Sequence, residues 1–185
     1  MGRGLGSLER NEQRLHEAAI EVWGLPTTQV ISCGVDSRPV RRTLKEPQLV
    51  VFAGRVISEK GLDILLDAGK LVNNSRLFVA GDGVQKNFLE PRAGLNVEFV
   101  GHFSRAEMES RLKPAWVQVI PSAWEVPFGR AAAEAKMRGT AVIASDSGAL
   151  PEVVTDDRTG LIIPSGHVHP LALELNQLLS DRHIC

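Results

Sequence analysis

Residues 117–154 read V-Q-V-I-P-S-A-W-E-V-P-F-G-R-A-A-A-E-A-K-M-R-G-T-A-V-I-A-S-D-S-G-A-L-P-E-V-V, and this stretch decides the fold. Its apolar runs and its Ala-rich segment predict a strand, a loop and a helix, and then the same three elements again. The expected elements are a strand at 116–120, a loop at 122–128, a helix at 130–138, a strand at 141–144 and a helix that begins at Pro151. Such alternation is typical of a parallel α/β sheet, in which ligands bind outside the carboxyl ends of the strands.

Gly129 stands directly before the first of these helices. A residue without a side chain lets a ligand approach the first backbone N–H groups of the helix, which have no partner within the helix. Because these donors lie at the positive end of the helix dipole, they favour a negatively charged group. Gly129 therefore predicts a phosphate-binding site.

Two glutamates flank this predicted phosphate site. Glu134 lies just over one turn inside the helix, and Glu125 lies in the loop before it. An ionised carboxylate accepts hydrogen bonds from paired hydroxyl groups, such as those of a ribose or a sugar. Glu134 has a plainer alternative, because Arg130 is four residues earlier and can pair with it across one turn. The two carboxylates together indicate a nucleotide sugar rather than a nucleotide alone.

The rest of the chain extends the same pattern in both directions. Further strands are expected at 49–53, 76–80, 97–100 and 161–163. Each is followed by a helical pattern, and Ser104 with Glu107 predicts a capping box for one of these helices. About six strands alternating with helices predict a Rossmann-like parallel sheet with helices on both faces. This domain is expected at residues 48–185, and residues 1–47 predict a helix and a linker before it.

Arg55 and Lys60 follow the first of these strands, in the loop G-R-V-I-S-E-K-G at residues 54–61. Both side chains can reach over the carboxyl edge of the sheet, where a diphosphate on the Gly129 helix would lie. Arginine suits bidentate phosphate binding and lysine acts as a point charge, so the pair can neutralise a diphosphate without a metal ion. The alternative is that both are solvated surface charges.

The composition of the chain excludes several classes of protein. At 185 residues, 43% hydrophobic and with a net charge of −1, the chain can bury a substantial core and has no charge bias toward nucleic acid or an anionic membrane. No apolar run approaches the roughly 20 residues that span a bilayer. Cys33 and Cys185 lie far apart and without metal-binding spacing, which favours a reduced, cytoplasmic protein.

Three motifs occur in order along the second half of the chain: P-S-A-W-E-V-P-F-G-R-A-A-A-E-A, G-T-A-V-I-A-S-D-S-G-A-L-P-E-V-V and T-G-L-I-I-P. They resemble the donor-binding half of glycosyltransferase family 4, whose members have the two-domain GT-B fold and are retaining enzymes that need no metal. The resemblance runs from about Gly34 to the C-terminus. It implies that a nucleotide-sugar donor is bound by Arg55, Lys60, Gly81, Glu125, Phe128, Gly129 and Glu134, and that this chain carries no complete set of catalytic residues.

One position departs from the family pattern. The family usually has two glutamates with seven residues between them, and the place of the first is held here by Val126. Glu125 stands one residue early. Two hypotheses follow: either the loop bulges so that Glu125 recovers the usual place, or Val126 occupies it and the sugar is held loosely.

The resemblance also implies what lies around this domain. We expect the chain to be the C-terminal part of a longer enzyme, or a product truncated at both ends, that lacks the N-terminal acceptor domain and is inactive alone. Residues 1–47 then include an interdomain helix. The expected partners are a nucleotide sugar and an acceptor that is a glycan, a lipid or a small molecule, with peripheral membrane association of the full-length enzyme and no nucleic acid. No metal or other cofactor is expected.

Two other functions remain open from the sequence. A sugar-nucleotide epimerase can use the same fold, although the P-F-G loop with Glu134 argues against it. A non-catalytic nucleotide-sugar-binding remnant of a transferase is favoured by Val126 and by the expected absence of an acceptor domain. The sequence does not name the sugar, the base or the acceptor.

Overall fold

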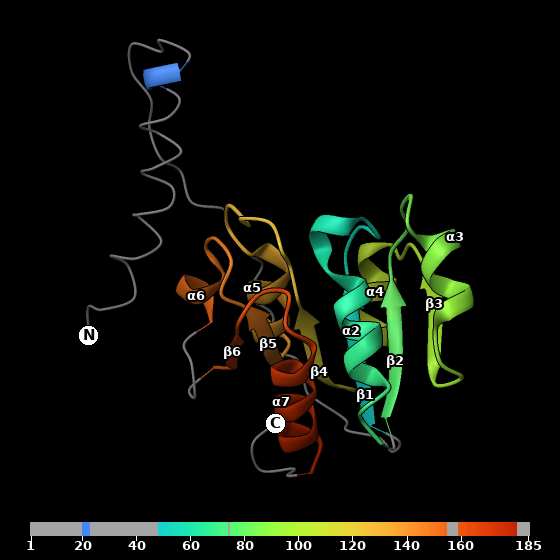
Figure 1. Ribbon diagram of the computed structural model, residues 1–185. Coiled ribbons are helices and arrows are strands. Elements are labelled where there is room, and N and C mark those ends of the chain that lie inside the picture. The colour runs from blue at the N-terminus through green and yellow to red at the C-terminus, as the bar shows by residue number, and fades with distance from the viewer. Residues whose placement is uncertain (1–19, 23–47, 74, 155–158, 181–185) are drawn as a thin grey trace.

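The computed structural model describes residues 20–22, 48–73, 75–154 and 159–180 (Figure 1). Residues 20–22 are helical. The remainder of the helix and linker predicted at 1–47 lies outside the described residues, as do Cys33 and Cys185.

Six parallel strands form one sheet, in the order β3-β2-β1-β4-β5-β6. Their bounds are β1 (Gln48–Ala53), β2 (Ser75–Ala80), β3 (Val97–Gly101), β4 (Ala115–Ile120), β5 (Ala141–Ser145) and β6 (Leu161–Ile163). The chain builds outward from β1 to β3, then returns to the other side of β1 and builds outward again. The reversal of direction therefore falls between β1 and β4, as in the dinucleotide-binding α/β folds.

The helices that connect these strands are short, apart from the last. Their bounds are α2 (Leu62–Gly69), α3 (Lys86–Leu89), α4 (Arg105–Leu112), α5 (Arg130–Met137), α6 (Leu150–Val153) and α7 (Val168–Ser180), with 3-10 turns at Ser58–Lys60 and Glu90–Arg92. The capping box predicted at Ser104 and Glu107 is confirmed at the start of α4. The helix expected after β2 is divided into α3 and a 3-10 turn, because Pro91 has no N–H to continue an α-helix.

The strands alternate their side chains between two apolar layers, which confirms helices on both faces. In β1, Val50 and Phe52 pack in one cluster with residues of α2 and α7. Leu49 and Val51 pack on the opposite face, against Leu112 of α4. Figure 1 shows α2 and α7 on the near side of the sheet and α5 behind it. Because helices cover both faces of the sheet, a binding site is expected at the ends of the strands.

Two helices from residues 117–154, α5 and α6, cover part of the far side of the sheet. Ala132 and Ala135 of α5 pack with Leu150 of α6 against alternate residues of β5. Small residues on α5 let this helix approach the sheet closely, so the start of the helix lies near the carboxyl end of β4. None of the helices in the described ranges has the length and apolar character needed to cross a membrane.

Candidate functional site

A cavity of about 330 Å³ lies at the carboxyl edge of the sheet, where the strand order reverses. Three parts of the chain line it: residues 52–54 with Lys60, residues 119–120, and residues 126–131. It therefore occupies the crevice in which open α/β sheets bind ligands. A volume of this size is at the lower end of the range for small-molecule sites.

The cavity forms because β1 and β4 separate near their carboxyl ends. The residues paired between these two strands end at Val51 and Gln118. In contrast, the pairing of β1 with β2 reaches Ala53, and the pairing of β4 with β5 reaches Ile120. The last residues of β1 and β4 thus line a cavity between the two strands instead of pairing with each other. The sequence could not indicate them, because their meeting depends on the order of the strands.

Gly129 lines this cavity as the residue before α5, as the sequence predicted. Its φ is 77°, in the left-handed region that other residues rarely adopt, and a Cβ built there would lie 3.1 Å from Cδ2 of Leu150. Among the described residues, no side chain caps the start of α5. The positive end of the helix dipole therefore faces the cavity, which gives this wall an affinity for anions.

The start of α5 is anchored from beneath by a buried polar pair. Gln118 of β4 donates a hydrogen bond from Nε2 to the carbonyl of Ala131, at 3.2 Å. Nη2 of Arg138, at the other end of α5, donates to Oε1 of Gln118 at 2.6 Å. One glutamine thus joins both ends of the helix to the central sheet and fixes where the helix begins. Sequence reasoning missed both residues, since a glutamine inside an apolar strand has no local signal of such a role.

Lys60 lies on the opposite side of the cavity and is partly buried. Burial lowers the pKa of its ammonium group below the ordinary 10.5, and the nearby charge of Arg55 lowers this pKa further, while Glu59 opposes both effects. A cation that is desolvated and repelled by a second cation gains stability from an anion placed beside it. Lys60 and the start of α5 therefore make one cavity suited to a phosphate group.

Arg55 is close enough to Lys60 to influence it but does not line the cavity. Its side chain is exposed at the mouth of the loop between β1 and α2. Of the two basic residues predicted from the sequence, the structure thus brings one into the cavity and leaves the other at the surface nearby. The role of Arg55 in binding a ligand stays a prediction.

Glu134 lies outside the cavity lining, on the surface of α5. Its Oε1 accepts a hydrogen bond from Nε of Arg130 at 2.9 Å, which is the pairing across one turn that the sequence offered as an alternative. The exposed fractions are 69% for the Arg130 side chain and 32% for that of Glu134, so the pair contributes only about 0.3–0.5 kcal/mol. A weak pair of this kind does not prevent the carboxylate from accepting ligand hydroxyls, and that role stays a prediction.

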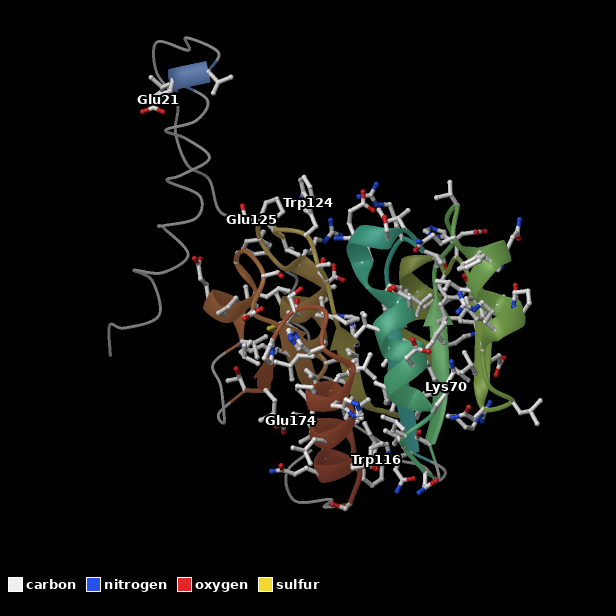
Figure 2. The ribbon with its side chains drawn as sticks, in the orientation of Figure 1. Glu21, Lys70, Trp116, Trp124, Glu125 and Glu174 are labelled. Carbon is white, nitrogen blue, oxygen red and sulfur yellow. The ribbon has the colours of Figure 1, made fainter. Side chains whose placement is uncertain are left out.

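The structure places Val126, and not Glu125, at the cavity. Val126 lines it and packs against the apolar cluster of α5 and α6, whereas Glu125 is exposed (Figure 2). The carbonyl of Val126 accepts a hydrogen bond from the N–H of Ala149 at 2.8 Å, and a Cβ built on Gly148 would lie 2.3 Å from the nitrogen of Val126. These contacts hold the backbone of Val126 at the cavity, which is the arrangement that the second hypothesis describes. Whether Glu125 contacts a donor sugar stays a prediction.

Phe128 and Gly81 complete the residues singled out from the sequence. Phe128 is partly buried and lines the cavity. Gly81 is buried outside the lining, donates its N–H to the carbonyl of Gly101 at 2.7 Å, and lies directly under the carbonyl of Gly54. Gly81 therefore supports the loop that carries Arg55 and Lys60, and its contact with a donor stays a prediction.

No group of three or more His, Cys, Asp or Glu residues that could hold a metal ion occurs within the described ranges. The positive charge at the cavity comes instead from two lining residues, Lys60 and Arg130, and from the helix dipole of α5. Such a site can bind an anion and stabilise negative charge that develops on it.

Comparison with known proteins shows which family the sequence resembles. Residues 36–185 match the family model described as "Glycosyl transferases group 1". A glycogen synthase from Mycobacterium tuberculosis is 31% identical over 171 residues, which cover 85% of this chain and 41% of that enzyme.

Solved structures agree with the sequence relatives. A sucrose-phosphate synthase from Thermosynechococcus elongatus superposes with a TM-score of 0.78 at 28% identity, covering 91% of this chain and 48% of that one. HepE from Anabaena, solved in complex with UDP, gives a TM-score of 0.66 at 25% identity and covers 74% of this chain and 40% of its own. The chain thus spans less than half the length of each of these three relatives.

Proposed function

The chain belongs to the glycosyl transferases group 1 family, and from this we propose that it forms the nucleotide-sugar-binding domain of a family 4, retaining, metal-independent glycosyltransferase. What supports this function most directly is the cavity at the strand-order reversal, which is lined by Lys60 and by the uncapped start of α5. HepE was solved with UDP bound, which makes UDP the first ligand to test.

In the proposed complex, the diphosphate lies between Lys60 and the first N–H groups of α5, and Arg55 adds positive charge from the surface near the cavity. Glu134 accepts hydrogen bonds from the ribose hydroxyls, and the sugar lies near Val126 and Phe128. An acceptor hydroxyl replaces the diphosphate at the anomeric carbon: the bond from carbon to diphosphate oxygen breaks, a bond to the acceptor oxygen forms, and the hydroxyl proton passes to the departing diphosphate. Lys60 and α5 stabilise the departing diphosphate.

The arrangement of the whole protein is part of the same proposal. Residues 48–185 are proposed as the donor-binding domain and residues 1–47 as an interdomain helix and linker. The acceptor, a glycan, a lipid or a small molecule, is proposed to be bound by another domain, so that residues 1–185 bind the donor without transferring its sugar. Without that domain the reacting groups are not held together, and the rate advantage of proximity is lost.

The first prediction tests binding without a metal. The purified chain is expected to bind UDP in the presence of EDTA, because Lys60, Arg55 and the α5 dipole supply the positive field. Binding measured by titration calorimetry should weaken as the salt concentration rises, since exposed charges are screened. A strict requirement for magnesium or manganese would contradict the proposed site.

The second prediction concerns pH. Burial and Arg55 hold the pKa of Lys60 below 10.5 in the free protein, and a bound diphosphate raises it again. The affinity for UDP should therefore be highest below the free-state pKa of Lys60 and fall as the pH rises through it. Titrations at a series of pH values from neutral into the alkaline range measure this fall. The same series on Lys60→Met should be flat, and an equal fall in that variant would assign the effect to another group.

The third prediction compares the two glutamates. Glu134→Ala should weaken the binding of UDP and of UDP-glucose alike, because the ribose is common to both ligands. Glu125→Ala should leave both affinities unchanged, since the structure has Val126 at the cavity and Glu125 in solvent. A lost charge-assisted hydrogen bond is worth about 1.5–3 kcal/mol, or about tenfold or more in affinity, which calorimetry resolves.

Each glutamate can contradict this assignment independently. A selective loss of UDP-glucose affinity in Glu125→Ala would show that the loop moves on binding and brings Glu125 to the sugar. An unchanged UDP affinity in Glu134→Ala would leave Glu134 with its ion pair to Arg130 as its only role.

A further inference from the structure

The loop that carries Lys60 is attached to the segment after β4 through one carbonyl group. The carbonyl of Glu59 accepts hydrogen bonds from Oγ of Ser122 at 2.9 Å, from the N–H of Ala123 at 3.0 Å and from the N–H of Trp124 at 3.3 Å. Glu59 directly precedes Lys60 in the chain. Three donors on the acceptor next to Lys60 restrain the backbone from which its side chain projects.

The residue on the other side of Lys60 is held against the same segment. A Cβ built on Gly61 would lie 2.1 Å from the carbonyl oxygen of Pro121, so the two backbones are in direct contact. Both neighbours of Lys60 are therefore fixed to residues 121–124. With its backbone held in this way, Lys60 can adjust its position at the cavity only by rotation of its own side chain.

Ser122 is itself held in place by hydrogen bonds from residues at the ends of two other strands. It is fully buried, and its carbonyl accepts hydrogen bonds from Oγ of Ser145 at 2.6 Å and from Oγ of Ser165 at 3.2 Å. Ser145 ends β5, and Ser165 follows β6. Ser122 thus links the loop between β1 and α2 to three strands on the other side of the cavity.

We propose that Ser122 is a positioning residue for Lys60: its hydroxyl fixes the Glu59 carbonyl and so holds the ammonium group across the cavity from the start of α5. This inference rests on the proposed function for the role of Lys60 in diphosphate binding. Without the hydroxyl, the loop must be ordered when the ligand binds, and part of the binding energy is used for that ordering. A serine that only stabilised the fold would affect binding whether or not Lys60 were present.

A double-mutant cycle separates the two roles. UDP affinity is measured by titration calorimetry for the unmodified chain, Ser122→Ala, Lys60→Met and the double variant. Ser122→Ala is expected to weaken UDP binding by about threefold to tenfold in the unmodified chain, and to have no further effect beside Lys60→Met. Ser75→Ala, which alters a buried serine at the opposite end of the sheet, is the matched control and should leave UDP affinity unchanged in both backgrounds.

A second readout does not depend on a ligand. Amide hydrogen exchange of peptides covering residues 54–61 should be faster in Ser122→Ala than in the unmodified chain and in Ser75→Ala, because the loop has lost one of its attachments. If Ser122→Ala yields no folded protein, Ser145→Ala is used in the same cycle, since it removes the hydrogen bond that holds the carbonyl of Ser122.

The outcomes distinguish this inference from the proposed function. Faster exchange together with a loss of affinity that needs Lys60 supports both. Faster exchange in a protein that does not bind UDP retains the attachment of the loop by Ser122 but overturns both the proposed function and the positioning role that rests on it. An equal loss of affinity with and without Lys60, or unchanged affinity in Ser122→Ala, overturns the positioning role while UDP binding by the unmodified chain still supports the function.

Discussion

Gly81→Ala is expected to lower the free energy of unfolding by about 3 kcal/mol or more, or to prevent folding altogether. Gly81 has a φ of 151°, which L side chains rarely adopt, and a Cβ built there would lie 1.8 Å from the carbonyl oxygen of Gly54. The obstacle is backbone and cannot rotate away. The loop that begins at Gly54 would have to move, so any folded protein that remains should also bind UDP more weakly.

Gly101→Ala is the matched control for this change. Gly101 also has a positive φ, 74°, but a Cβ built there meets no atom within 4 Å. Gly101→Ala should therefore lower the free energy of unfolding by about 1 kcal/mol, which is the cost of placing alanine in this backbone conformation. Urea unfolding followed by circular dichroism measures both variants. Equal losses of stability in the two would show that the contact with Gly54 does not matter.

Lys60→Met is expected to reduce the affinity for UDP by about 10-fold to 100-fold, which corresponds to about 1.5–3 kcal/mol for a hydrogen bond to a charged group. Methionine keeps much of the apolar stem of lysine and removes the charge, so the packing around the cavity should be preserved. Lys60 is the cation that lines the cavity from the loop side, and its partial burial reduces the screening of the interaction by solvent.

Lys70→Met supplies the comparison. Lys70 lies at the end of α2, away from the cavity (Figure 2), and its side chain is 53% exposed in a surface ion pair with Asp67. Removing this charge should leave UDP affinity unchanged. Similar losses in the two variants would mean that only the net charge of the domain attracts the nucleotide, and an unchanged affinity in Lys60→Met would remove Lys60 from the site.

The features that sequence reasoning found are those with local causes. About six strands were expected, and the part of the chain that the structure describes contains six, because each is an apolar run bounded by loop residues. The capping box at Ser104 and the left-handed glycine before α5 likewise depend on neighbours within a few residues. Gly129 reached the cavity as predicted because the start of a helix after a parallel strand lies at the carboxyl edge by construction.

The features that the sequence did not indicate depend on contacts between distant parts of the chain. Val126 faces the cavity because its backbone is held against Gly148 and Ala149, and no rule of spacing contains that contact. Ser122 and Gln118 act through carbonyl groups of other loops and helices, and a carbonyl group is the same in every residue. The roles of Arg55, Glu125 and Glu134 toward a ligand stay predictions.

The separation of β1 from β4 divides the sheet into two halves of three strands each, joined at the amino ends of the central pair and opened at the carboxyl ends. At the carboxyl ends, no residue pairs of β1 and β4 hold the two halves together. A molecule seated there touches Lys60 on the first half and the start of α5 on the second. A bound molecule therefore connects the two halves of the sheet, and the domain with this molecule bound should be more stable to unfolding than the domain without it.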